Sequence, residues 1–212
     1  MEISGALRTL IRPGRWPLGP RIEVDLGSTT GPLAELGALL SHTNGFTTAN
    51  AGVQVFRAGP EGLGPELGGW NAAETWKDTY GPLAAGLVCF GQDLFGVQFA
   101  VEDNACVVTL DPETGHREVI SESLDGWARW LLADLDQHAL RSFATDYQNR
   151  NGPLGYDERL LPRRFFVLGG SYDDENLKVA DAVTAMRIRG PIAQQLSAVP
   201  DGARVRLRID PQ

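Results

Sequence analysis

Hydrophobic positions between residues 87 and 120 fall into short runs of the kind that form β-strands. Residues 87–90 are uniformly apolar, whereas residues 97–102 alternate apolar side chains with polar or small ones. Two more runs, 105–110 and 116–120, are separated by a turn at 111–115 that contains Pro and Gly. A period of two sends successive side chains to opposite faces of a strand, and Pro and Gly preset turn dihedrals. The pattern therefore predicts a meander of antiparallel strands with one buried face and one wet face.

Helical periodicity flanks this meander. Pro32 suits the first turn of a helix, which is expected to end near Asn44 and Gly45. Ser123 can cap a second helix over residues 124–136. The apolar face of the first helix consists of Leu33, Leu36, Leu39 and Leu40, and the inward stripe of the second consists of Leu124, Trp127, Ala128, Leu131 and Leu135. The patterns together predict that Phe90, Phe99, Trp127 and Leu131 are core residues.

The remaining segments give weaker signals. Further helices are predicted at 72–80 and 139–147, and short strands at 21–26, 53–56, 165–168 and 205–209. A short helix or extended segment is expected at 181–186 and another helix at 191–196, while residues 59–69 and 149–162 are expected to be loops. The predicted organisation is an irregular N-terminal arm (1–31), one α+β domain (32–148) and a C-terminal extension packed on it (149–212). The predicted fold class is α+β, a twisted antiparallel sheet backed by helices.

The negative charge is concentrated in the same part of the chain. Residues 93–136 hold ten acids and two bases, a net −8 that equals the formal charge of the whole 212-residue chain. A pI near 4.9 argues against a nucleic-acid binder, which needs clustered Lys and Arg to displace phosphate counterions. The acidic strand ends and turns are therefore candidates for docking a basic protein partner, with a face kept acidic for solubility as the alternative. The candidate partner-binding residues are Asp93, Glu102, Asp103, Asp111 and Glu113.

Motifs for other chemistry are missing from the sequence. It contains no phosphate loop ending in Lys-Ser/Thr, no His-Glu-x-x-His, no Cys-x-x-Cys and no Gly-x-Ser-x-Gly. The segment 91–96 has glycines at both ends, but Asp93 would repel phosphate, so a tight turn is predicted. The carboxylates near 102 and 111 flank turns rather than form a ligand-spaced loop, and neither a metal nor a cofactor is expected. His42, His116 and His138 are far apart in sequence and favour structural roles.

Three further features concern the cysteines, the compartment and the C-terminal arginines. Cys89 and Cys106 lie in apolar runs and are expected to be buried and reduced, with a cross-strand disulfide as the alternative. Neither a secretory leader pattern nor an apolar run of membrane-spanning length is found, so a cytoplasmic protein is expected. Three arginines on one face of the last predicted strand, near Arg187 and Arg189 in sequence, suggest a charged edge strand or a basic patch complementary to the acidic segment. These three are Arg204, Arg206 and Arg208.

Several of these features together resemble the SUKH superfamily, the Smi/Knr type of fungal cell-wall-synthesis regulators and their bacterial relatives. The resemblance covers residues 30–136. It rests on the helix that ends in Leu-Ser-His-Thr-Asn-Gly-Phe at 40–46, then Val53 and Phe56, Trp76 and Tyr80, Phe90 with Asp-Leu-Phe-Gly at 93–96, Phe99, the strand at 107–111 with its Thr-Gly turn, and Trp127 with Leu131. The resemblance implies a non-enzymatic binding module, and for bacterial members an immunity protein that blocks a cognate toxin. The loop at 59–69 is long for this pattern, and the extension after residue 148 lies outside it.

Two alternatives to a toxin-binding module stay open. One is a regulatory or scaffold protein. The other is a small hydrolase or transferase with a dispersed site made from carboxylates near Asp93 and Asp111 together with His116, which displaced titrations in a pocket would favour.

Overall fold

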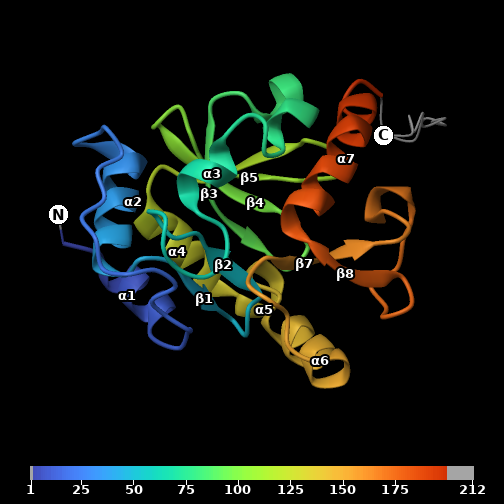
Figure 1. Ribbon diagram of the computed structural model, residues 1–212, viewed down its shortest axis with the longest axis horizontal. Coiled ribbons are helices and arrows are strands. Elements are labelled where there is room, and N and C mark those ends of the chain that lie inside the picture. Colours follow the sequence, from blue (N-terminus) through green and yellow to red (C-terminus); the bar gives the residue numbers. More distant parts are fainter. Residues whose placement is uncertain (1, 200–212) are drawn as a thin grey trace.

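A six-stranded antiparallel sheet, with its strands in the order β1-β2-β3-β4-β5-β6, is the centre of the fold (Figure 1). The structure is a computed structural model that describes residues 2–199. The six strands are β1 (Phe46–Thr48), β2 (Val53–Val55), β3 (Leu87–Asp93), β4 (Gln98–Glu102), β5 (Cys106–Leu110) and β6 (Arg117–Ser121). Every neighbouring pair is antiparallel. The predicted α+β class and the predicted meander at 87–120 are therefore confirmed.

The turns of this meander form where the sequence predicts them. The β4–β5 turn uses Asp103 and Asn104, both with positive φ (48° and 54°), a conformation that short polar side chains tolerate. The Asn104 Oδ1 accepts the backbone N–H of Leu33 at 2.9 Å, near the start of helix α2 (Gly31–His42). This bond satisfies one of the helix's free N-terminal donors and fixes the hairpin to the helix.

One face of the sheet packs against α2, α1 (Gly5–Ile11) and α4 (Leu124–Ala133). Trp127 of α4 lies between two strand aromatics, with ring centroids 5.1 Å from Phe90 and 5.5 Å from Phe99. These three residues and Leu131 are at most 1% exposed. The predicted core residues are therefore confirmed. Ser123 caps α4 through its hydroxyl, which accepts the N–H of Gly126 at 3.0 Å.

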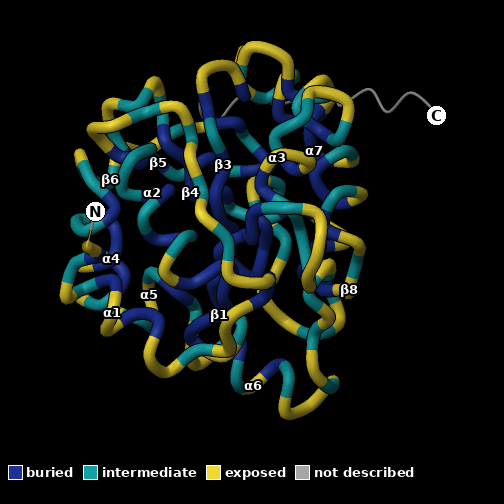
Figure 2. The backbone as a smooth tube through the Cα atoms, turned by 60° about the vertical axis from the view of Figure 1, so that its left-hand side comes forward, coloured by how far each residue is buried: buried dark blue, intermediate teal, exposed yellow. Residues whose placement is uncertain are grey.

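The other face is covered as well, so the prediction of a wet face is wrong. Gln98 and Ala100, expected to face water, are 0% exposed. They lie beneath the C-terminal extension, whose helix α7 (Ala182–Leu196) packs Ala182 and Met186 into the second core cluster. Figure 2 shows the buried backbone running through the middle of the molecule under exposed loops. Alternation with Gln and Ala does not distinguish a solvated face from one buried by a distant segment.

The extension is a small α/β unit at one end of the molecule (Figure 1). It follows α5 (Leu135–His138) and α6 (Arg141–Asn151) and contains the antiparallel pair β7 (Glu158–Pro162) and β8 (Leu177–Asp181), the 3-10 turn η3 (Phe166–Leu168) and α7. The expected loop at 149–162 is confirmed only for residues 152–157, because α6 ends at Asn151 and β7 begins at Glu158. The expected strand at 165–168 is wrong, because the strand pair forms at 158–162 and 177–181. The two expected segments at 181–186 and 191–196 are one helix that continues through Pro191.

Other boundaries differ towards the N-terminus. Residues 1–31 contain the helix α1, capped by Ser4, whereas no strand forms at 21–26. β1 is a strand that the sequence pattern did not predict. The predicted helix at 72–80 is wrong, because a short helix α3 (Leu67–Asn71) precedes it and the segment itself forms turns with the 3-10 helices η1 (Lys77–Thr79) and η2 (Gly81–Ala84). The predicted strand at 205–209, with Arg204, Arg206 and Arg208, lies outside the described residues.

Candidate functional site

The five acidic residues singled out from the sequence do not form one surface. Because β3, β4, β5 and β6 run antiparallel in sequence order, Asp93, Asp111 and Glu113 lie at one end of the sheet and Glu102 and Asp103 at the other. The two groups differ in exposure as well as in position, and each is described in turn.

Glu102 and Asp103 lie at the β4–β5 turn, near the surface. Asp103 is exposed, and Glu102 is half-buried and forms an ion pair with Arg117 of β6. Arg117 also donates to the carbonyl oxygens of Leu83 (2.7 Å) and Ala85 (2.8 Å), so this pair holds the η2 segment against the sheet. Of the five candidates, Asp103 is the one whose charge is free to meet a partner.

Asp111 and Glu113 belong to the β5–β6 turn. The Asp111 Oδ1 accepts the backbone N–H of Glu113 at 2.7 Å and of Thr114 at 3.1 Å, so its carboxylate organises the turn. Glu113 is only 4% exposed and accepts the N–H of Val167 from the extension at 2.9 Å. Burial raises the pKa of Glu113 above its ordinary value. The prediction of Glu113 as a docking residue is wrong, because its carboxylate is used to fasten η3 to the sheet.

Asp93 ends β3 and is 8% exposed, so its prediction as a docking residue is also wrong. Its Oδ1 accepts the backbone N–H groups of Phe95 and Val97, both at 2.8 Å, which builds the tight β3–β4 turn expected at 91–96. Burial raises the pKa of Asp93 to about 6, against the opposing effect of these two hydrogen bonds and of Arg159 and Arg189. The carboxylate is therefore a buried structural charge.

Arg189 of α7 is buried against the same turn. Its Nη1 donates to the carbonyl of Phe95 at 2.6 Å, and its Nε to the carbonyl of Ala185 at 3.0 Å. Gly96 permits this approach: its φ is +83°, and a Cβ there would lie 2.7 Å from the Arg189 Nη2. Arg189 is thus not part of a basic surface patch, and Arg187 is paired with Asp78 at 2.9 Å. Both arginines join α7 to the rest of the molecule.

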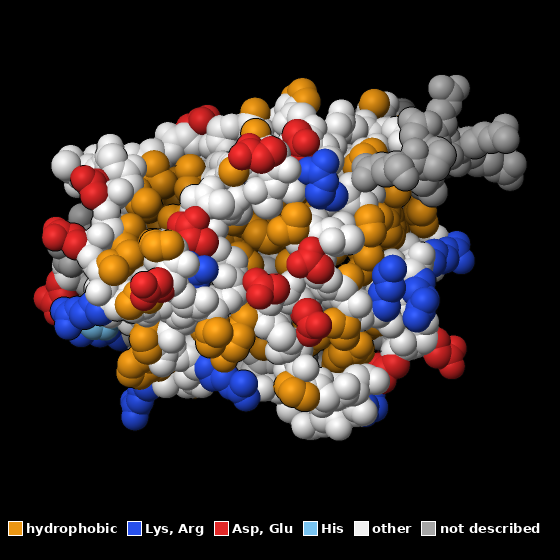
Figure 3. Space-filling model, in the orientation of Figure 1, with side chains coloured by type: hydrophobic (Ala, Val, Ile, Leu, Met, Phe, Trp, Pro, Cys, Tyr) orange, Lys and Arg blue, Asp and Glu red, His pale blue; other side chains and the backbone are white. Residues whose placement is uncertain are grey.

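The exposed acidic surface lies instead along the last strand of the sheet. Glu118 and Val119 of β6 are exposed, Val119 to 63%, and Glu122 follows directly after the strand. We use the name acidic edge for Glu102, Asp103, Glu118 and Glu122 together with Val119. Glu102, Asp103 and Glu122 all act electrostatically on Cys106 at the start of β5, whereas Glu118 pairs with Thr109 further along that strand. On the face drawn in Figure 3, by contrast, acidic and basic side chains are scattered among apolar and neutral ones.

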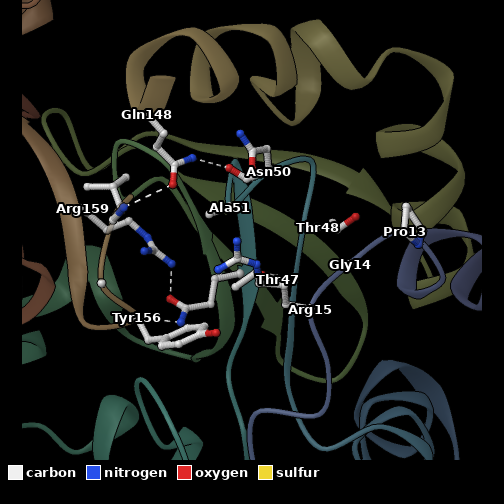
Figure 4. A pocket seen from close by; sticks show the side chains of 13 residues that line it. Pro13, Gly14, Arg15, Thr47, Thr48, Asn50, Ala51, Gln148, Tyr156 and Arg159 are labelled. Carbon is white, nitrogen blue, oxygen red and sulfur yellow. Dashed lines mark hydrogen bonds between the residues drawn. The ribbon is translucent and has the colours of Figure 1, made fainter. Parts of the chain in front are cut away.

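A polar cavity of about 220 Å³ lies elsewhere, between the N-terminal segment, the β1–β2 hairpin and the chain around β7. Its floor contains Gln54, which is 0% exposed and donates to the carbonyl oxygen of Tyr156 at 2.9 Å. Arg159 of β7, only 2% exposed, donates to the Gln54 Oε1. In Figure 4 the guanidinium groups of Arg15 and Arg159 extend toward each other from opposite walls. Sequence reasoning missed this cavity.

The rim of this cavity includes a strained hairpin. Ala49, Asn50 and Ala51 are three successive non-glycine residues with positive φ (51°, 53° and 65°). Gln148 of α6 donates to the carbonyl of Asn50 at 2.6 Å, which holds the hairpin in place (Figure 4). At Gly52 a Cβ would lie 2.0 Å from the carbonyl of Ala139, so only glycine fits there.

His138 and the two cysteines are residues of chemically reactive types. The ring of His138 stacks on Trp130 at 4.0 Å and its Nδ1 lies 2.6 Å from that residue's carbonyl oxygen, which is a structural role. Both cysteines are free, so the disulfide alternative is excluded, and Cys89 is buried while Cys106 is partly exposed. Among residues 2–199, no three His, Cys, Asp or Glu side chains are grouped so that they could hold a metal ion.

Comparisons with known proteins inform the fold. No protein-family model matches the chain, and a search of curated proteins finds no match. A search of solved structures finds Atu4351 from Agrobacterium tumefaciens, with a TM-score of 0.50 and 14% sequence identity over 84% of this chain and 86% of that one. At this identity the similarity shows a shared fold and nothing further. Across the described part of the chain, no helix has both the length and the apolar character that crossing a bilayer requires.

Proposed function

We propose that this chain is a non-enzymatic protein-binding module that docks a basic protein partner on its acidic edge, in the manner of an immunity protein that neutralises a toxin. The observation that carries the proposal is the position of β6 at the edge of the sheet. It is the last strand of the sheet, and no other strand in residues 2–199 pairs with its outer side. The resemblance to the SUKH superfamily, which rests on the sequence, supports the same class of function.

An edge strand that no other strand pairs with is a template for another chain. Its outward N–H and C=O groups can pair with an added strand, which gives affinity through main-chain hydrogen bonds. Natural proteins usually protect such edges with charge, twist or a covering loop. Glu118 could serve that end, but Val119 beside it exposes a β-branched apolar side chain at 63%, which favours strand addition rather than opposing it.

Charge around the edge defines the chemistry of the partner. Glu118 and Glu122 form no ion pair with any residue that the structure describes, and Asp103, which like Glu122 acts on Cys106, is exposed. Clustered unpaired carboxylates attract a basic surface and speed encounter, and burying them against it relieves their mutual repulsion. The partner we propose is therefore a basic protein, such as a toxin domain. The proposal places this encounter in the cytoplasm, where free thiols such as those of Cys89 and Cys106 stay reduced.

The test is affinity purification of the tagged full chain from its native cell, with two variants of equal charge change. The edge variant carries Glu118→Lys, Val119→Lys and Glu122→Lys. The control variant carries Asp146→Lys, Glu175→Lys and Val179→Lys, which are exposed positions on α6 and the extension. A basic protein that is retained in stoichiometric amount by the wild type and the control, and lost with the edge variant, is the expected result.

Two outcomes would overturn the proposal. One is retention of the same partner by the edge variant, which would place the docking surface elsewhere. The other is a wild-type protein that retains nothing beyond what the control resin retains. Thermal melts of all three proteins separate loss of binding from loss of folding, and Glu118→Gln with Glu122→Gln provides a milder edge variant if the first melts early.

A further inference from the structure

We propose that the cavity between the N-terminal segment and β7 binds a small oxyanion, a carboxylate or phosphate group, through Arg15 and Arg159. This inference is independent of the protein partner, because the cavity and the acidic edge involve different residues. It rests on the charge of the lining, on the burial of Arg159 and on unfilled hydrogen-bonding capacity.

The charge of the lining is opposite to that of the protein. The full chain has 27 acidic residues against 19 basic ones. The cavity is nevertheless lined by two arginines and by no carboxylate; the lining residues are Pro13, Gly14, Arg15, Thr47, Thr48, Asn50, Ala51, Gln54, Gln148, Leu154, Gly155, Tyr156 and Arg159. A concave site with one sign of charge concentrates ions of the opposite sign.

Arg159 forms no direct ion pair with any described residue, although the carboxylates of Asp93 and Asp157 stabilise its charge from further away. It is 2% exposed, and its described hydrogen bonds go to the carbonyl of Glu158 and the side-chain amide of Gln54, both neutral acceptors. Its Nε has no acceptor among the described residues. A buried guanidinium that is not fully hydrogen-bonded costs stability, and an anion bound in the cavity would add to the compensation that these two carboxylates give. Burial lowers the pKa of Arg159 only to about 10, so the group stays charged at neutral pH.

Arg15 provides a second positive charge on the opposite wall. Its backbone is fixed by a two-way bridge to Thr47, with N–O distances of 2.9 and 3.0 Å. Its guanidinium, in contrast, makes neither a hydrogen bond nor an ion pair with any residue between 2 and 199, although it extends into the cavity (Figure 4). A free guanidinium of this kind can recognise a carboxylate or phosphate group through two parallel hydrogen bonds.

The two glutamine side chains beside the arginines already have hydrogen-bond partners. The Gln148 amide donates to Asn50 and accepts the N–H of Leu154 at 3.2 Å, and the Gln54 amide donates to Tyr156. The charged groups with free hydrogen-bonding capacity are therefore the two arginines. A volume of about 220 Å³ is far above the roughly 10–15 Å³ that one water needs, so a phosphate ion or a small dicarboxylate fits.

The experiment is isothermal titration of the full chain with inorganic phosphate and, separately, with malonate, both at constant ionic strength. We expect saturable binding of at least one of them at a single site. Arg15→Gln should weaken it about tenfold or more, because one charge-assisted contact is removed. Arg21→Gln, an exposed arginine outside the lining, is the matched control and should bind like the wild type.

The titrations test whether the cavity binds an oxyanion and which class of oxyanion it binds. Binding of phosphate alone assigns a phosphate-bearing ligand, binding of malonate alone assigns a carboxylate, and binding of both assigns the shared oxyanion chemistry. No saturable binding of either probe overturns the proposal, as does binding that Arg15→Gln leaves unchanged. Substituting the buried Arg159, for example by Arg159→Lys, could prevent folding. Arg15 is exposed, so Arg15→Gln should fold, and the test therefore does not depend on the buried arginine.

Discussion

The buried carboxylate of Asp93 makes the stability of this protein depend on pH within a defined window. Burial raises the pKa of Asp93 from 3.8 to about 6, despite the N–H donors of Phe95 and Val97 and the positive charges of Arg159 and Arg189. Between these two pH values the folded chain holds a proton that the unfolded chain has released. The free energy of unfolding therefore falls as the pH rises through this window. At about 1.4 kcal/mol per pKa unit, the difference corresponds to about 3 kcal/mol.

Asp93→Asn isolates this contribution. Its Oδ1 can still accept the two backbone N–H groups, but the side chain cannot ionise. We expect the free energy of unfolding of the variant, relative to the wild type, to rise by up to about 3 kcal/mol between pH 4 and pH 7 and to stay level above pH 7. Urea unfolding across this range measures the difference, and the exposed Asp103→Asn is the control. A difference between wild type and Asp93→Asn that does not change with pH would refute the reasoning.

Three further predictions concern packing and accessibility. Trp127→Ala should lower the free energy of unfolding by about 3–5 kcal/mol, since the ring is fully buried; an unchanged thermal melt would contradict its place in the core. Gly96→Ala should destabilise the fold by more than about 1 kcal/mol, because it forces a positive φ and crowds Arg189; a melt equal to that of the wild type would show that the turn can relax. Cys89 should resist a thiol reagent at neutral pH until the protein unfolds, because burial raises its pKa to about 12, whereas the partly exposed Cys106 should react first; equal rates would oppose this assignment.

Local patterning accounts for the part of the fold that was predictable. The alternation in β4 and the apolar run in β3 need only their own residues to form strands, and α4 carries its cap and its apolar stripe within a few turns. Helix α1 carried a similar signal that was missed: Ser4 as a cap, followed by Leu7, Leu10 and Ile11 on one face. The many Pro and Gly residues that come next obscured it.

The candidate site was less predictable, because it depends on contacts between distant segments. Glu113 is buried by η3, which lies more than 50 positions further along the chain, and a carboxylate in a turn carries no local sign of such a cover. Arg15 and Arg159 line one cavity although their sequence neighbourhoods are unrelated. What the sequence did indicate was that the acidic residues gather in one part of the chain. The fold then selects, by burial, which of them reach solvent.

The most direct test of the central claim, that the acidic edge docks a basic protein, is the association rate of the purified partner at low and at high salt. The account predicts that Glu118→Gln with Glu122→Gln slows association and reduces its salt dependence, because exposed charges act mainly on encounter. The control pair Asp146→Asn and Glu175→Gln should leave both unchanged. If the edge variant associates at the wild-type rate with the wild-type salt dependence, the acidic edge is not the docking surface.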